Sequence, residues 1–354
     1  MFKDRAFLLD NTKIALIFLM IYGHMIQSFI TVNMTYKSVF LMIYSFHMPL
    51  LSFISGVVSK AAITNNNIKR FISKLAVPLI AFQVVYELPM IIFNSQITDC
   101  TFNLQPNALQ WYLLSLLSWR LMLPLFDNLH YPIIFSFFVA LFSGVCPLTG
   151  EYLGISRTLY LFPYFLMGHY LGMDKIRRLK FKGSSFLYAG ILVVAAGIFV
   201  HWPEIKHGWM YGSYAYAVLG HKEWYAAGYR VIVYCSSIII GTAFLGLVPS
   251  AKTRLTYLGE HSLYIYLWSG MYVVALGSLK VQSYVFKFNV ALSLSAFFLI
   301  SMAIVYLLSA KEVITFTDNY VFRPVECLLM PKNSRLYTQA VSEPGKEVSY
   351  VYPL

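Results

Sequence analysis

Two histidines lie inside apolar segments, where ionisable side chains are costly and are usually retained for a function. In the first segment, Lys13 is followed by ten residues that are almost all apolar and then by His24. In the second, His47 belongs to a Phe-His-Met-Pro run over residues 46–49. We expect both imidazoles to lie near the middle of a bilayer. Because imidazole titrates close to neutral pH, this pair predicts proton transfer inside the membrane.

The spacing between Lys13 and His24 places both on one side of a helix. Eleven steps of 100° leave them about 20° apart around the axis and about 16 Å apart along it. This arrangement predicts a pathway that opens near Lys13 and reaches the imidazole. The alternative is that Lys13 marks the membrane edge and that His24 binds a neighbouring helix. For His47, the alternative is a packing helix bent by Pro49.

The elements that position these residues are membrane helices. Of 354 residues, 58% are hydrophobic and 12% are charged, whereas about 25% are charged in soluble domains. The apolar segments are roughly twenty residues long, enough to cross a bilayer. We therefore expect an all-α, polytopic membrane helix bundle of about ten transmembrane helices, at residues 14–32, 39–59, 75–97, 110–126, 131–148, 158–173, 184–202, 227–248, 258–279 and 288–309. Residues 1–310 form the predicted transmembrane domain, and residues 311–354 a cytoplasmic C-terminal tail.

The net charge of +12 does not indicate binding to nucleic acid, because the basic residues lie in short loops between apolar segments. Such loops orient membrane proteins. Most Lys and Arg residues face the cytoplasm when the N-terminus lies there, so both termini are predicted to be cytoplasmic. The four cysteines are scattered without metal-ligand spacing, so no metal is expected.

Other polar side chains occur within the apolar segments. Glu87 could orient an imidazole as its acidic partner, or it could form a structural pair with Arg120 or Arg230. Both arginines could instead bind a pyrophosphate or a developing negative charge on a substrate.

The order of several short motifs resembles the membrane acyltransferase-3 family, most closely its fucose 4-O-acetylase-like branch. The basic residue, ten-residue spacer and histidine of the family correspond to Lys13 and His24, and its Phe-His-Met-Pro run corresponds to residues 46–49. A basic segment, a Trp-rich segment that begins at Trp111, and motifs at 162–168 and 262–266 follow in the same order. The chain departs from the family pattern at Trp268, where relatives often place a histidine.

The resemblance implies an O-acetyltransferase of the bacterial inner membrane that modifies polysaccharide, as in exopolysaccharide or O-antigen biosynthesis. An acetyl or similar short acyl group would pass from cytoplasmic acetyl-CoA to a hydroxyl of a polysaccharide or lipid-linked sugar. His24 would act as base or transient acyl carrier, with His47 as its partner. Trp111 would join the two arginines in binding substrate.

The same resemblance implies that Lys13, Lys69, Arg70 and Lys74 bind the acyl donor from inside. Basic loops more often fix topology and contact anionic membrane lipid. A transporter or flippase for a glycan or small metabolite is the alternative function, since many spans with ionisable residues suit that class as well. A homo-oligomer is a further possibility.

Overall fold

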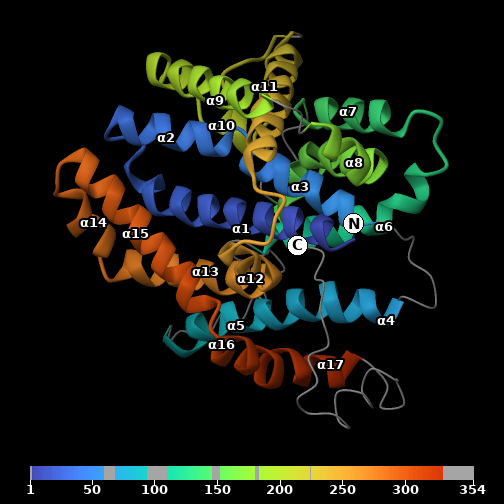
Figure 1. Ribbon diagram of the computed structural model, residues 1–354, viewed down its shortest axis with the longest axis vertical. Coiled ribbons are helices and arrows are strands. Elements are labelled where there is room, and N and C mark those ends of the chain that lie inside the picture. The colour runs from blue at the N-terminus through green and yellow to red at the C-terminus, as the bar shows by residue number, and fades with distance from the viewer. Residues whose placement is uncertain are drawn as a thin grey trace.

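The structure is a computed structural model that describes residues 2–59, 68–93, 110–145, 152–179, 183–223 and 225–329. These residues form helices joined by turns, with no β-strand among them (Figure 1), which confirms the predicted all-α class. Residues 60–67 of the basic segment and 330–354 of the predicted tail lie outside the described residues. The α-helices are α1 (Phe2–Ile26), α2 (Met34–Tyr44), α3 (His47–Val58), α4 (Ile68–Phe71), α5 (Val77–Phe93), α6 (Trp111–Phe126), α7 (Pro132–Ser143), α8 (Ile155–Arg178), α9 (Ser184–His201), α10 (Gly208–Tyr211), α11 (Ala226–Leu247), α12 (Arg254–Glu260), α13 (Ser262–Ser278), α14 (Val281–Phe286), α15 (Val290–Leu308), α16 (Lys311–Phe316) and α17 (Arg323–Leu329).

Each segment that was predicted to span the membrane overlaps one of these helices or, for 39–59, α2 and α3 together, with the bounds shifted by up to twelve residues. Residues 94–97 and 146–148 of the predicted spans lie outside the described residues. Five stretches of the described chain are long and apolar enough to cross a membrane: Phe7–Phe29, Met34–Val58, Ser184–His201, Ala226–Leu247 and Val290–Leu308. The protein is therefore a multi-pass membrane protein.

Helix α1 runs through the middle of the bundle, with α2 and α3 on one side and α13 and α15 on the other (Figure 1). A polar network fixes its first turns against α12. The Asn11 side chain donates to two backbone carbonyls and accepts from the hydroxyls of Thr253 at 3.0 Å and Thr256 at 2.8 Å. Gly259 lies so close to the carbonyl of Asp10 that a Cβ there would overlap it. These contacts set the position of α1 along its axis.

The second span consists of two helices, α2 and α3, with a break between them at residues 45–46. Pro49 is the third residue of α3, where a backbone N–H has no partner within the helix, so the proline costs no hydrogen bond there. The carbonyl of Ser45 accepts a hydrogen bond from the Ser237 hydroxyl of α11 instead. The break places His47, the first residue of α3, halfway along the span.

Helices α3 and α8 pack closely through glycine. A Cβ at Gly56 would overlap the carbonyl of Phe165, and a Cβ at Gly168 would overlap the carbonyl of Phe53. Small residues of this kind let membrane helices approach at backbone distance. The packing fixes α8 against the helix that carries His47.

Beyond residue 310, the chain continues as α16, a π-helical segment at 317–322 and α17. The π-helical segment and α17 pack against α5. Trp268 of α13 donates from Nε1 to the Thr317 hydroxyl at 2.9 Å, and Tyr264 donates to the Asp318 carboxylate at 2.8 Å. Residues 311–329 of the predicted tail are therefore packed on the bundle.

Candidate active site

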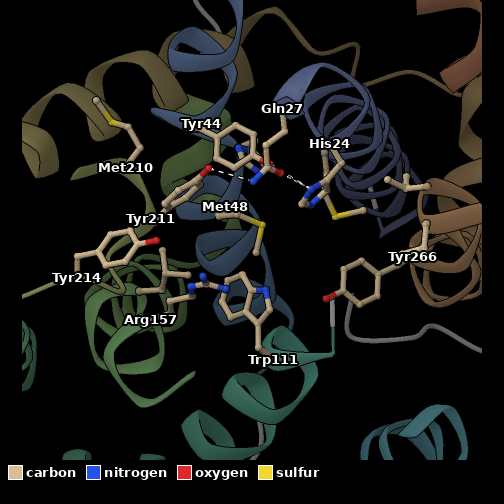
Figure 2. A pocket seen from close by; sticks show the side chains of 16 residues that line it. His24, Gln27, Tyr44, Met48, Trp111, Arg157, Met210, Tyr211, Tyr214 and Tyr266 are labelled. Atoms are coloured by element: carbon tan, nitrogen blue, oxygen red, sulfur yellow. Dashed lines mark hydrogen bonds between the residues drawn. The ribbon is translucent and has the colours of Figure 1, made fainter. Parts of the chain in front are cut away.

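A cavity of about 330 Å³ lies among α1, α3, α6, α8, α10 and α13. Its volume falls in the range of small-molecule sites. Both predicted histidines, His24 and His47, line it. Figure 2 shows His24 there, together with tyrosines, Trp111 and Arg157. Among the described residues that line it, Arg157 alone carries a permanent charge, and none is a carboxylate.

His47 is buried, and one of its ring nitrogens is occupied by the backbone. Its Nδ1 lies 2.9 Å from the carbonyl oxygen of Ile43. A carbonyl only accepts hydrogen bonds, so Nδ1 carries the hydrogen of the neutral ring. The lone pair therefore lies on Nε2, which is the nitrogen that can act as a base.

His24 has the same tautomer for a different reason. Its Nδ1 lies 2.9 Å from Oε1 of Gln27, while Nε2 of Gln27 donates to the Tyr211 hydroxyl at 3.2 Å. Figure 2 shows this chain of three side chains, which runs from α10 to the end of α1. Because the amide oxygen accepts, the lone pair of His24 is also on Nε2.

His24 lies toward one end of the apolar stretch that contains α1. This stretch runs from Phe7 to Phe29, so His24 lies about 9 Å beyond its middle at 1.5 Å per residue. The depth of His24 in the bilayer stays a prediction. Leu8 and Leu9 are buried in the bundle, so the buried part of the helix begins earlier than residue 14, where the first span was predicted to start.

Tyr44 lies between the two imidazoles. Its ring centroid is 6.2 Å from that of His24 and 4.5 Å from that of His47, edge to face in both cases. Phe40 stacks on the other side of Tyr44 with centroids 3.8 Å apart. The two histidines are thus held at one site by a rigid aromatic wall.

Arg157 is a site residue that the sequence analysis missed. It lies in the first turn of α8, and its guanidinium carbon is 5.1 Å from the centroid of the Trp111 ring (Figure 2). Its charge is within electrostatic range of His24 and Tyr44. Arg157 precedes a predicted span, where a basic residue is typically interpreted as a determinant of membrane orientation. Its position just before the 162–168 motif was the one feature of the sequence that indicated a functional role.

Three of the four residues that were predicted to bind the donor gather beside the middle of α1. Lys13 is buried, with Nζ 3.6 Å from an oxygen of Asp10. Burial, with the nearby charges of Arg70 and Lys13, lowers the pKa of Lys74 to about 8. Lys69 is exposed on α4 beside Arg70. This basic cluster (Lys13, Arg70 and Lys74) is separated from His24 by roughly 16 Å along α1.

Two of the predicted site residues lie elsewhere. Glu87 of α5 accepts a hydrogen bond from Gln83 at 3.3 Å, and Arg120 is half-buried on α6. Neither lines the cavity. Among the described residues, no group of three or more His, Cys, Asp or Glu side chains is placed to hold a metal ion.

Arg230 also lies outside the cavity, where it supports one wall. Its guanidinium donates to the carbonyls of Ala140 and Tyr214, both at 3.0 Å, and lies 4.7 Å from the ring centroid of Tyr216. Tyr214 lines the cavity, so Arg230 fixes the segment that carries it.

Comparison with known proteins identifies a family. The family described as "Acyltransferase domain" (acyltransferase-3) matches residues 8–310. That range contains every residue of the cavity and of the basic cluster. No curated protein and no solved structure matches the chain. The match covers most of the chain, including the residues that line the cavity with its two imidazole bases. This multi-pass protein therefore belongs to the acyltransferase-3 family of membrane acyltransferases.

Proposed function

We propose that the protein is an integral-membrane O-acyltransferase that moves an acetyl or similar short acyl group from cytoplasmic acyl-CoA to a hydroxyl of a cell-surface or lipid-linked glycan. One observation carries the proposal. His24 and His47 line one cavity, and each has Nδ1 engaged in a hydrogen bond, so that each neutral ring keeps Nε2 as a base.

The reaction requires a base because an alcohol is a weak nucleophile. Nε2 of His24 takes the proton of the acceptor hydroxyl as the oxygen attacks the carbonyl carbon of the thioester. The new C–O bond forms, and the C–S bond of the tetrahedral intermediate then breaks. The imidazolium returns its proton to the leaving thiolate, which gives the ester and the CoA thiol. Such acid–base help contributes about 10²–10⁴ in rate.

Arg157 and His47 complete the proposed machinery. The guanidinium of Arg157 is the cation of the cavity, and it would stabilise the negative charge that develops on the thioester oxygen. His47, next to Tyr44, would position the thioester or pass the proton between His24 and the thiolate.

The acceptor half of the proposal rests on the wall formed by the segment between α9 and α11. Met210, Tyr211 and Tyr214 of this segment line the cavity opposite His24 and Tyr266 (Figure 2). Tyrosine offers an apolar face and a hydroxyl at its edge, which suits a sugar ring. With the N-terminus in the cytoplasm, this wall belongs to the extracytoplasmic half of the molecule.

The donor half rests on the basic cluster. Lys13, Arg70 and Lys74 are close enough for their charges to interact, and clustered cations attract phosphate groups. Lys13 lies near the middle of α1, about three turns before His24, on the side of His24 that faces the predicted cytoplasmic N-terminus. The two substrates would therefore approach from opposite faces of the membrane.

The test uses membranes that contain the full-length protein, acetyl-CoA and the surface polysaccharide of the host cell. We expect release of CoA thiol together with new acetyl ester on the polysaccharide, detected by mass spectrometry. His24→Ala and His47→Ala should reduce both signals to background while the proteins remain inserted. Full activity of His24→Ala would contradict the proposal. Glycan transport without thiol release would favour the flippase alternative.

A further inference from the structure

A second cavity, of about 190 Å³, lies between α3, α8 and α11. We call it the α8–α11 groove. Ten of its fourteen lining residues are apolar or glycine, and the polar ones are Tyr164, Lys175, Ser237 and Thr242. Helix α3 forms its floor through residues 49–53, and both α8 and α11 pack on α3.

We propose that the α8–α11 groove binds an anionic phospholipid, with one acyl chain along the groove and the phosphate at Lys175.

The length and position of the groove fit one leaflet. The groove touches α3 at Pro49 and Leu50, next to the break at the middle of the second span. From there it follows α11 from Ser237 to Leu245, about 12 Å at 1.5 Å per residue, and α8 from Tyr164 past the non-helical Gly172 to Lys175. Half of a hydrocarbon core of about 30 Å is a similar length. An acyl chain in the groove would thus run from the membrane midplane to its surface.

The lining favours an alkyl chain over the pantetheine arm of CoA. Pantetheine carries two amides, and buried amides require hydrogen-bond partners. The hydroxyl of Ser237 already donates to the carbonyl of Ser45. Along most of its length the groove offers Leu, Ile, Met and Phe side chains, which gain stability from burying methylene groups rather than amides.

The charge at the open end favours an anionic headgroup. Lys175 is the charged side chain among the described lining residues, and no carboxylate is among them. Both Lys175 and Arg178, one turn further along α8, are exposed. Basic residues at a membrane surface attract anionic lipid. The Lys175 end of the groove therefore favours a phospholipid headgroup with a negative phosphate and no positive charge.

The groove and the active-site cavity share one turn of α3. His47 and Met48 line the cavity, and Pro49 and Leu50 line the groove. An acyl chain packed on Pro49 and Leu50 would support the turn that positions His47. This inference concerns lipid binding alone and stands apart from the proposed reaction.

The test measures lipid retained by the purified full-length protein, by native mass spectrometry after exchange into detergent with phosphatidylglycerol or phosphatidylcholine of identical chains. We expect one retained phosphatidylglycerol and about fivefold weaker retention of phosphatidylcholine, the effect of one basic residue near a membrane surface. Lys175→Glu should remove this preference. Lys252→Glu, an exposed lysine outside the groove, should keep it.

A second variant fills the groove. A Cβ at Gly241 would make ordinary contact with Leu50 at 3.7 Å, so Gly241→Leu should fold and place the rest of its side chain in the groove. We expect it to lose the retained lipid of either kind, whereas Gly228→Leu, in open space on the same helix, should keep it. Equal retention of both lipids by the unaltered protein, or retention by Gly241→Leu, would overturn the proposal. Displacement of the lipid by stoichiometric acetyl-CoA would assign the groove to the donor and overturn it as well.

Discussion

The middle and the last turn of α1 carry ionisable side chains in opposite surroundings. Near the middle, Lys13 is paired with Asp10, and Asn11 accepts hydrogen bonds from the hydroxyls of Thr253 and Thr256 at the start of α12. In its last turn, His24 has one hydrogen-bonded nitrogen and faces a cavity. Burial alone therefore does not distinguish structure from chemistry. The distinction is whether a polar group keeps a free lone pair next to open space.

The distance between the basic cluster and the cavity constrains how they would work together. A straight helix holds Lys13 and His24 roughly 16 Å apart, so no side chain can reach both sites. A donor bound by its phosphates at the basic cluster would extend its flexible arm along α1 to bring the thioester to His24. Changes at the cavity should then alter the chemical step, and changes at the basic cluster should alter donor affinity.

The largest effect is expected for the two histidines. His24→Ala and His47→Ala should each lower kcat by about 10²–10⁴ because each removes a base from the cavity. The double variant should be little worse than either single one, since groups that act in one step are not additive. Initial rates of thiol release measure all three.

His169→Ala is the matched control for the histidine variants. His169 also donates from Nδ1 to a backbone carbonyl, that of Ser59 at 2.7 Å, but it lies outside the cavity. Its replacement should leave kcat of the inserted protein unchanged. If the two single effects multiplied in the double variant instead, His24 and His47 would serve separate steps.

The second effect concerns Arg157. Arg157→Leu should lower kcat by about 10²–10³, the range for removing one donor to a developing oxyanion. The KM for the donor should stay the same because its phosphates bind at the basic cluster, roughly 16 Å from His24 along α1. Arg157→Lys should restore part of the rate, because lysine keeps the positive charge but lacks the planar set of N–H donors of the guanidinium.

The same measurement on Arg120→Leu tests the prediction made from the sequence. Arg120 does not line the cavity, so its removal should leave the chemical step intact. If Arg120→Leu lost as much kcat as Arg157→Leu, the result would support the predicted role of Arg120 in substrate binding.

A smaller effect is expected for Gln27. Gln27→Leu removes the acceptor that fixes the tautomer of His24, so the ring can present either nitrogen. We expect kcat to fall between about tenfold and 10²-fold, the upper figure being the cost of a misplacement of 1 Å. Tyr211→Phe, which removes only the far end of the chain, should cost less. An unchanged kcat in Gln27→Leu would show that Gln27 does not fix the tautomer of His24.

The sequence predicted the helices and both histidines because these signals are local. Long apolar segments identify membrane helices, and an imidazole within one is rare. Lys13 and His24 do share a helix, as the spacing predicted, but the cavity reaches only the second of them.

The rest of the site depends on contacts between segments that are distant in sequence. Gln27 matters because Tyr211 takes its amide hydrogen and turns its oxygen toward His24. Arg157 reaches the cavity because α8 packs on α3 through glycine. Glu87 was a candidate either for the acidic partner of an imidazole or for a structural ion pair, and it does not line the cavity. No periodicity along one helix could show which helix faces the cavity.

The smallest effect is expected at the basic cluster, where the affinity for CoA should depend on pH. Lys74, whose pKa is lowered to about 8 by burial and by Arg70 and Lys13, is charged below that pH and neutral above it. A bound phosphate needs the charged form, so CoA affinity should fall as pH rises through about 8. The loss should be up to about fivefold, as for a partly exposed ion pair. Lys74→Arg stays charged and should remove this step while leaving the pH dependence of kcat, which belongs to the histidines. Calorimetric titration of CoA between pH 7 and 9 measures it, and an identical decline in Lys74→Arg would place the phosphates away from Lys74.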